Sequence, residues 1–310
     1  MDSIIPVHKL FIMKTMPLVS VAIITYNQKV FLAEAIQSVL QQDYEHIEIV
    51  IGDDCSTDGT QQMLLDYEQK YPGKFIIKLS SKNSGITQNS NQVHFACNGK
   101  YIAWLGGDDL MLPQKISKQV AFMELHPEYN LVYHNLDVFD SYNGNHIRFY
   151  NNQRNSYTGD ITKSIKYGTF NGACSTMVRR AASPPYGFDE KFPVASDWLY
   201  WIEHLSSGGK IGFINEVLGR YRIHNKNASN PNSQHGLQGA MDSIETCNLL
   251  LKRYPHYKKL INYRLSILYR SLRKQVYIKN LLKSLHYNPY NISSAILLGI
   301  HLLTFKKIKF

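Results

Sequence analysis

Two adjacent aspartates close the stretch WLGGDD, Trp104 to Asp109, in this chain of 310 residues. Like charges repel, so such a pair is costly unless something neutralises it. Mg²⁺ and Mn²⁺ prefer carboxylate oxygens and share them with substrate phosphates. Neighbouring side chains of an extended segment point to opposite sides. We therefore expect one carboxylate to accept bonds from ribose hydroxyls and the other to hold a cation; the alternative is a solvated Asp-Asp turn.

A second acidic motif, GDDCSTDGT, follows the apolar run Ile47–Ile51. Asp58 is typical of a helix cap, which needs only one carboxylate. Asp53 and Asp54 remain, and a carboxylate at a strand end can accept a hydrogen bond from the imide N–H of a pyrimidine base. Further along, Asp197 precedes an aromatic helix, where it either caps the helix or acts as a base.

Alternating apolar runs and helical periods must position these side chains. Strands are predicted at 19–25, 47–51, 75–79 and 101–105, and helices at 28–41, 60–70, 86–98 and 113–126. This rhythm indicates an α/β fold with a mostly parallel sheet flanked by helices. Ligands of such sheets bind beyond the carboxyl ends of the strands. The motifs TYN, GDDCSTDGT, KNSGIT and GGDDL all follow strands there, so we expect one ligand site at this edge.

The rest of the chain is less regular. The polar, tyrosine-rich stretch 140–171 is predicted to be loops with short strands that face the substrate. A helix at 198–205 and strands at 210–214 and 217–223 follow. After Asn230 we expect a helical tail, broken near Pro255 and Pro289 into two or three segments.

Charge is distributed unevenly along the chain. The net charge is +10, yet residues 251–310 hold 13 Lys and Arg and no acidic residue, which leaves 21 basic and 24 acidic residues in the first 250. A basic tail with interleaved Leu, Ile and Tyr favours an anionic partner such as a lipid surface; a solvated helix face is the alternative. The four cysteines form no CxxC pair, so a disulfide framework or zinc site is not expected.

Neither end of the chain resembles a membrane anchor. The apolar run Ala295–Phe305 is shorter than the roughly 20 residues that a span requires. Residues 1–16 lack the apolar core of a signal peptide, and one hypothesis is that native translation starts at Met13 or Met16.

Six motifs in order resemble family 2 glycosyltransferases with the GT-A fold. They are VSVAIITYN, IVIGDDCSTDGT, NSGIT, YIAWLGGDDLMLPQKISKQV, GFDEKFPVASDWLYWIEHL and YRIHNKNAS, which cover about two thirds of the chain. The resemblance implies a GT-A domain over residues 17–230, a basic helical tail over 231–310 and an N-terminal extension over 1–16.

The resemblance also implies a role for individual residues. Asp197 would be the catalytic base, and Asp109 of the DxD-like motif, helped by His224, would bind the divalent cation, Mn²⁺ or Mg²⁺. Nucleotide-sugar contacts are implied for Thr25, Tyr26, Asn27, Asp54, Asn83, Gly85, Asp108 and Arg222, with Asp54 reading the base and Asp108 facing the ribose. Many members carry an arginine where this chain has Ser90, so diphosphate neutralisation must depend on the metal, Arg220 or Arg222.

These observations predict an inverting, metal-dependent transfer of a sugar from a nucleotide diphospho-sugar, expected to be UDP-linked, to an acceptor hydroxyl. By family analogy the acceptor is a glycan or lipid-linked oligosaccharide of a bacterial surface polysaccharide, and the enzyme is cytoplasmic and peripheral on the inner face of the plasma membrane. The sugar, the linkage and the oligomeric state are not predicted.

Two alternatives remain. A sugar nucleotidylyltransferase would need a glycine-rich basic loop after the first strand, where this chain has TYNQKV. A non-catalytic membrane- or RNA-binding protein would leave the acidic strand ends unexplained, so we expect no nucleic-acid partner.

Overall fold

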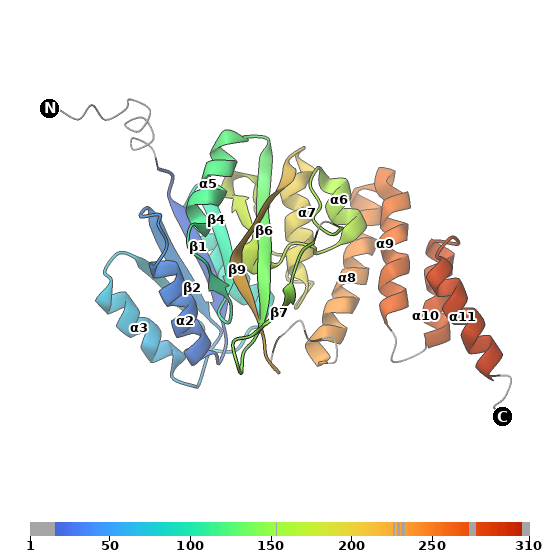
Figure 1. The fold of residues 1–310 in the computed structure, drawn as a ribbon, viewed down its shortest axis with the longest axis horizontal. Coiled ribbons are helices and arrows are strands. Elements are labelled where there is room, and N and C mark those ends of the chain that lie inside the picture. The colour runs from blue at the N-terminus through green and yellow to red at the C-terminus, as the bar shows by residue number, and fades with distance from the viewer. Residues whose placement is uncertain are drawn as a thin grey trace.

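The computed structural model describes residues 16–152, 154–225, 227, 230, 233–272 and 277–305. Residues 1–15 of the expected N-terminal extension lie outside this part of the chain. Within it, nine strands form one sheet in the order β3-β2-β1-β4-β8-β6-β9-β5, with β7 paired to β6 (Figure 1). The strands are β1 Val19–Thr25, β2 Ile47–Asp53, β3 Phe75–Leu79, β4 Tyr101–Gly106, β5 Leu110–Met111, β6 Tyr129–Asp140, β7 His146–Phe149, β8 Met177–Arg179 and β9 Lys210–Ile223.

The four strands of the first half are parallel, as the sequence predicts. β1 pairs with β2 and β4, and β2 pairs with β3, all in parallel register. The runs of β1, β2 and β4 are almost wholly buried, because helices cover both faces of the sheet. Their carboxyl ends therefore lie at one edge, where the polar motifs follow.

The second half of the sheet differs from the expected pattern. Residues 210–223 form one strand, β9, which the sequence split in two; the ladder with β6 stays parallel through local register shifts between Asn135 and Leu136. β6 was not predicted. β8 and β5 run antiparallel to their neighbours, while β6 and β9 share the direction of the first four strands. The sheet as a whole is mixed: the first four strands are parallel as expected, whereas four of the eight pairings among the described strands are antiparallel.

Two layers of helices cover the sheet. The helices are α2 Lys29–Leu40, α3 Thr60–Lys70, α4 Ile86–Ala96, α5 Lys115–Leu125, α6 Ile161–Tyr167, α7 Ser196–Ser206, α8 Gln234–Arg253, α9 Lys258–Ser271, α10 Tyr277–Tyr287 and α11 Ile292–Phe305. One core cluster packs α2, α3 and α5 against one face. The other joins α4, α6 and α7 to the opposite face and continues into α8 and α9.

The first two helices of the tail are thus part of the same core. Ile244, Cys247 and Leu250 of α8 and Ile261 and Leu265 of α9 are buried in the cluster that contains the sheet. The helices are interrupted after α8 at Pro255 and between α10 and α11 near Pro289, as expected.

The last two helices stack beyond α9, away from the sheet (Figure 1). A buried polar cluster joins them: the Ser284 hydroxyl donates to the Ser266 carbonyl at 2.6 Å and lies 2.8 Å from the Ser294 hydroxyl. Asn291 donates to the Ser284 oxygen at 3.1 Å. In the described part of the chain, no helix combines the length and apolarity needed to cross a bilayer.

Candidate active site

The polar motifs gather at the carboxyl edge of β1, β2 and β4. Thr25 at the end of β1 is in register with Asp53 of β2, and Ile24 with Gly106 of β4. The Asp54 amide donates to the Thr25 carbonyl at 3.1 Å, and the Gly107 amide to that of Ile24 at 3.0 Å. The parallel ladders therefore continue into the loops that carry the predicted site residues.

Asn27 joins the first two of these loops. Its backbone has a φ of 51°, in the left-handed region that Asn tolerates. Its amide donates to the Ser56 hydroxyl at 2.7 Å, and its side-chain oxygen accepts the Thr57 amide at 2.8 Å. Beside it, the Tyr26 side chain is 47% exposed at the edge, where a ligand can contact the ring.

Asp54 positions the loop after β3. Its two carboxylate oxygens accept the amides of Ser84 at 2.7 Å and Gly85 at 2.8 Å, and Gly85 has a φ of 88° that favours glycine. Asn83 is exposed on this loop. Each carboxylate oxygen keeps a second lone pair, so the predicted contact between Asp54 and a base remains open.

The pair Asp108–Asp109 lies in a tight turn, not in an extended segment. The Asp109 amide donates to the Gly106 carbonyl at 3.1 Å. A Cβ on Gly106 would stand 2.7 Å from Asp108 Oδ1 and 3.2 Å from Asp109 Oδ2. The expectation that the two carboxylates face opposite sides is therefore wrong, because the turn brings one oxygen of each over Gly106. Two carboxylate oxygens around a space that a methyl group would fill suit a hard divalent cation.

The other oxygens of the pair are held by the end of β9. Asp109 Oδ1 accepts the Arg222 amide at 2.9 Å, and Asp108 Oδ2 lies 2.9 Å from His224 Nε2. Asn227 also donates to Asp108 Oδ2 at 3.3 Å. The structure thus places His224 against Asp108, whereas the sequence paired it with the metal ligand Asp109. In the described chain, no group of three or more His, Cys, Asp or Glu is arranged to hold a metal.

The guanidinium of Arg222 is fixed beneath this turn. Its Nε donates to the Asp108 carbonyl at 2.7 Å, and its Nη2 pairs with Glu34 of α2. The Phe31 and Phe139 rings lie 4.5 and 4.7 Å away on cation–π contacts. Arg220, the other expected phosphate contact, pairs instead with Asp137. Both guanidinium groups are therefore paired with carboxylates of the protein itself.

Asp109 lies in a low-polarity environment. Burial and the neighbouring charge of Asp108 raise the pKa of its carboxyl well above the usual range, opposed by the Arg222 amide and the Cys174 thiol. A carboxylate in this position is strongly stabilised by a cation, because the cation offsets both the cost of burying the charge and the repulsion from Asp108.

Asp197 begins α7 on the same side of the molecule. Its carboxylate accepts the Trp198 amide at 2.8 Å, so it does contribute to the start of the helix. Burial raises the pKa of this carboxyl to about 6, which is close to the value that a general base needs near neutral pH. After burial and the Cys174 thiol, the charges of Asp197 and Asp109 both raise the pKa of the Tyr150 hydroxyl.

Asp242 of α8, which sequence reasoning missed, holds the segment that leads to Asp197. Its buried Oδ2 accepts the amides of Val194 at 2.8 Å and Ala195 at 3.0 Å. From the other side, the Thr87 hydroxyl of α4 lies 2.8 Å from that of Ser196. An aspartate in a basic, helical stretch gave no signal of this contact.

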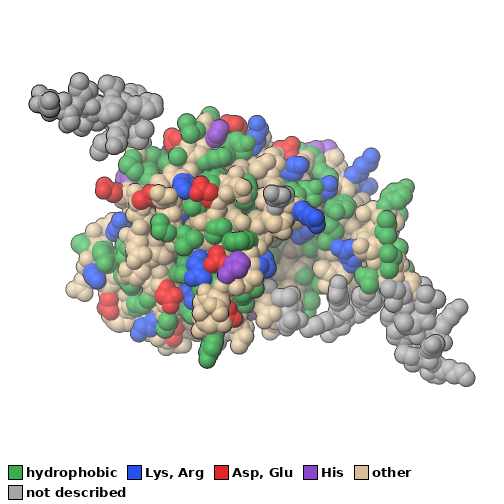
Figure 2. All heavy atoms as spheres, in the orientation of Figure 1, with side chains coloured by type: hydrophobic (Ala, Val, Ile, Leu, Met, Phe, Trp, Pro, Cys, Tyr) green, Lys and Arg blue, Asp and Glu red, His purple; other side chains and the backbone are tan. Residues whose placement is uncertain are grey.

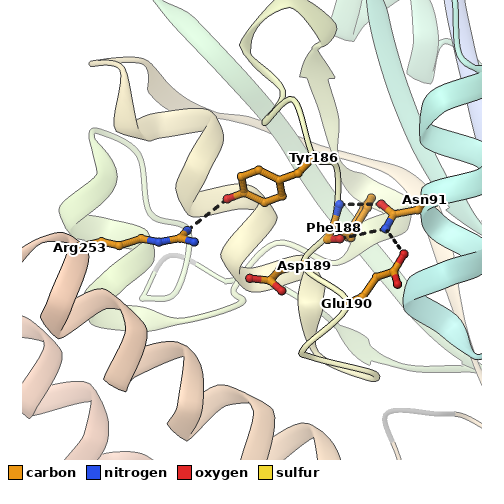
Figure 3. A pocket seen from close by; sticks show the side chains of 6 residues that line it. All are labelled: Asn91, Tyr186, Phe188, Asp189, Glu190 and Arg253. Carbon is orange, nitrogen blue, oxygen red and sulfur yellow. Dashed lines mark hydrogen bonds between the residues drawn. The ribbon is translucent and has the colours of Figure 1, made fainter.

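A cavity of about 280 Å³ separates α4 from the end of α8 (Figure 3). Asn91 lines one side of it: its side-chain amide donates to the Phe188 carbonyl at 2.9 Å, and its side-chain oxygen accepts the Phe188 amide at 2.7 Å. Glu190 accepts from Asn91 at 3.3 Å, and Arg253 pairs with Glu203. Its Asn91, Glu190 and Arg253 side chains are thus engaged with protein groups, and Asn91 fixes the loop before Asp197. Ser90 points back to the Ile86 carbonyl and offers no charge to a diphosphate.

The model of the family described as "Glycosyl transferase family 2" matches residues 20–183. The putative teichuronic acid biosynthesis glycosyltransferase TuaG of Bacillus subtilis is 30% identical over 214 residues, which are 69% of this chain and 82% of TuaG. An uncharacterized Mycobacterium tuberculosis protein is 30% identical over 208 residues, 66% of this chain; the chain spans only 58% of that relative's length.

Solved structures show the same fold at low sequence identity. Staphylococcus aureus TarS 1–349 in complex with UDP superposes with a TM-score of 0.66 at 17% identity, over 88% of this chain and 81% of TarS 1–349. A Pyrobaculum calidifontis mannosyltransferase bound to GDP-Man and Mn²⁺ gives 0.63 at 14% identity, over 94% and 81%. The sheet, its acidic edge and these likenesses agree, and the chain belongs to glycosyl transferase family 2 with a GT-A fold.

Proposed function

We propose that this protein is an inverting, metal-dependent glycosyltransferase that moves a sugar from a UDP-sugar to an acceptor hydroxyl. The observation that carries the proposal is the turn at Gly106, which brings oxygens of Asp108 and Asp109 together, while the charges of Asp109 and Asp197 both act on the Tyr150 hydroxyl. One arrangement thus offers both a cation-binding edge and a base with a pKa of about 6.

The chemistry follows from the residues present. Asp197 takes the proton of the acceptor hydroxyl while that oxygen forms a bond to the anomeric carbon. The bond from the anomeric carbon to the diphosphate breaks on the opposite side, and the diphosphate leaves with its electron pair. Base catalysis of this kind contributes about 10²–10⁴-fold. A cation held by Asp109 and Asp108 would supply positive charge for the leaving diphosphate.

The base and ribose contacts of the donor are also proposals. Tyr26 is exposed beside Asp54 at the strand edge, which suits a ring contact with a base. UDP is the nucleotide in the TarS complex, and Mn²⁺ is the cation in the mannosyltransferase complex. These ligands belong to those proteins and support the choice of UDP and Mn²⁺ as first probes.

We place the reaction in surface-glycan synthesis on the cytoplasmic face of a membrane. The name of TuaG refers to teichuronic acid biosynthesis. Figure 2 shows basic and hydrophobic side chains over the C-terminal helices, and Leu282, Ile292 and Ile296 are exposed there beside Lys279 and Lys283. Such a face suits an anionic bilayer. Other tail cations are excluded from this role: Arg253 pairs with Glu203, and Arg264 packs 5.3 Å from the Trp198 ring. Arg273, Lys274, Lys306, Lys307 and Lys309 lie outside the described residues.

A screen of nucleotide sugars, read by released nucleotide, tests the proposal. We expect Mn²⁺-dependent release from a UDP-sugar by the wild type, loss in Asp109→Asn and Asp197→Asn, and wild-type rates in Asp66→Asn, an exposed aspartate of α3. Release by Asp109→Asn or Asp197→Asn at the wild-type rate would refute the assigned roles.

A further inference from the structure

A cavity of about 380 Å³ opens between the end of β7 and the end of α6. Four aromatic rings and three polar side chains line it: Tyr150, Tyr157, Tyr167, Phe170, Arg148, Asn155 and Thr169. It lies within the stretch 140–171 that the sequence predicted to face the substrate. Its lining residues lie between the motifs GGDDL and ASDW, outside the six motifs quoted above.

Tyr150 forms a wall between this cavity and the acidic edge. A Cβ on Gly172 would stand 3.8 Å from the Tyr150 ring and 3.9 Å from the Cys174 sulfur, and that thiol contacts Asp109. The ring centroid of Tyr221, next to Arg222, is 5.9 Å away. Burial foremost, and the charges of Asp197 and Asp109 with it, raise the pKa of the Tyr150 hydroxyl to about 12. A sugar in the cavity would therefore be separated by the Tyr150 side chain from Cys174 and the Asp109 carboxyl that this thiol contacts.

The walls of the cavity are fixed before any ligand binds. The Tyr157 and Tyr167 rings stack at 3.7 Å. The Tyr133 hydroxyl donates to the Tyr157 carbonyl at 3.0 Å. Asn151, which is buried, donates to the Phe170 carbonyl at 2.9 Å. Preorganised aromatic walls lower the entropic cost of binding, and the flat faces of pyranose rings pack well on such surfaces.

Arg148 brings a positive charge to the rim. Its guanidinium lies 5.8 Å from the Tyr150 ring centroid, and its Nη1 donates to the Phe149 carbonyl at 3.4 Å. Arg220 and Arg222 each pair with a carboxylate, whereas within the described residues no carboxylate lies within ion-pair distance of Arg148. A guanidinium in this position matches a carboxylate or phosphate in a bidentate arrangement.

We propose that this cavity is the acceptor subsite and that it selects an acceptor sugar bearing an anionic group, held by Arg148. The inference rests on the proposed transferase function. The anion is the carboxylate of a hexuronic acid or a phosphate attached to the acceptor sugar. Both sources present the same chemistry to Arg148, and the experiment separates them.

Saturation-transfer NMR on the full chain, with UDP and diamagnetic Mg²⁺ present in excess to occupy the donor site, tests the proposal. The probes are glucuronate, galacturonate and mannuronate, the corresponding hexose 6-phosphates, and the neutral methyl hexosides. We expect at least one anionic class to bind, at least tenfold weaker binding in Arg148→Gln, and no change in Arg154→Gln, an exposed arginine of the same loop outside the lining.

The class that binds in an Arg148-dependent way identifies the source of the anion. The proposal is overturned if neither class binds, if Arg148→Gln binds the anionic probes as the wild type does, or if neutral hexosides bind equally well. Mn²⁺-dependent donor hydrolysis, measured on the same protein preparations without added UDP, should be unchanged in Arg148→Gln. Its absence from the wild type would instead refute the proposed function.

Discussion

The pH dependence of transfer follows from the pKa of Asp197. A general base works only when deprotonated, so the rate should rise with pH through the pKa of about 6 that burial gives this carboxyl. The deprotonated fraction is about 0.1 at pH 5 and about 0.9 at pH 7 for such a group. An unperturbed aspartate would be more than about 0.9 deprotonated at both. We expect the single-turnover rate at saturating donor and Mn²⁺ to fall about tenfold from pH 7 to pH 5.

Two controls separate the base from other titrating groups. Calorimetric UDP binding at each pH shows whether the donor site is still occupied at pH 5. Asp197→Asn should retain a residual rate with no inflection near pH 6. Above pH 6, Asp197→Asn should unfold at a higher temperature than the wild type. The raised pKa of the wild-type carboxyl stabilises the folded state only at low pH, and that stability is lost as the pH rises through about 6. A rate that is flat from pH 5 to pH 7 with the donor bound would refute the role of Asp197.

Three substitutions test other parts of the structure. Gly106→Ala, whose Cβ would stand 2.7 Å from Asp108 Oδ1, should weaken Mn²⁺-dependent UDP binding at least tenfold by calorimetry, while Gly299→Ala, in open space on α11, should bind normally. Asp242→Ala should lower kcat about tenfold with the donor KM unchanged, since it frees the segment before Asp197. Asp242→Asn keeps an oxygen that can accept the two amides and should therefore retain most of the wild-type kcat. Equal losses of kcat in both variants would contradict the positioning role. Lys115→Met should raise the free energy of unfolding by about 3 kcal/mol near pH 7. Burial lowers the pKa of this lysine to about 7, which costs the folded wild type about 4 kcal/mol at that pH, and loss of the hydrogen bond to the Gln119 side chain returns about 1 kcal/mol of it. The wild type regains that stability only as pH rises above 7, and denaturation of the variant at or below the wild-type denaturant midpoint would contradict this.

The parallel half of the sheet could be predicted because each strand is a continuous apolar run that ends in a polar motif. β3, Phe75–Leu79, was predicted with the bounds it has, and the acidic edge followed from the topology. β6 was missed because its sequence, YNLVYHNLDVFD, interrupts the apolar pattern with His134 and Asn135. Both residues use their polar atoms locally: His134 Nδ1 lies 2.7 Å from the Asn135 carbonyl, and the Asn135 side chain accepts the Leu136 amide.

The candidate site also has a part that could be predicted from the sequence and a part that could not. Its carboxylates could be predicted by residue type, but their orientation depends on the turn at Gly106 and on the Arg222 amide of β9, which lies more than 100 residues away. The role of the tail was also only partly predictable. Its lysines indicate a face that contacts an anionic surface. The helical spacing of Ile244, Cys247 and Leu250 indicates that the helix packs on the sheet domain, where these residues are buried, but the charge pattern dominated the interpretation.

Calorimetric titration of UDP, with Mn²⁺ or with EDTA, tests the central claim most directly. We expect the wild type and Asp197→Asn to bind UDP with similar affinity when Mn²⁺ is present, and Asp109→Asn to show no UDP binding. We further expect EDTA to abolish binding to the wild type. Equal UDP binding by Asp109→Asn, or binding that EDTA leaves unchanged, would contradict a cation-dependent donor site at the Asp108–Asp109 turn.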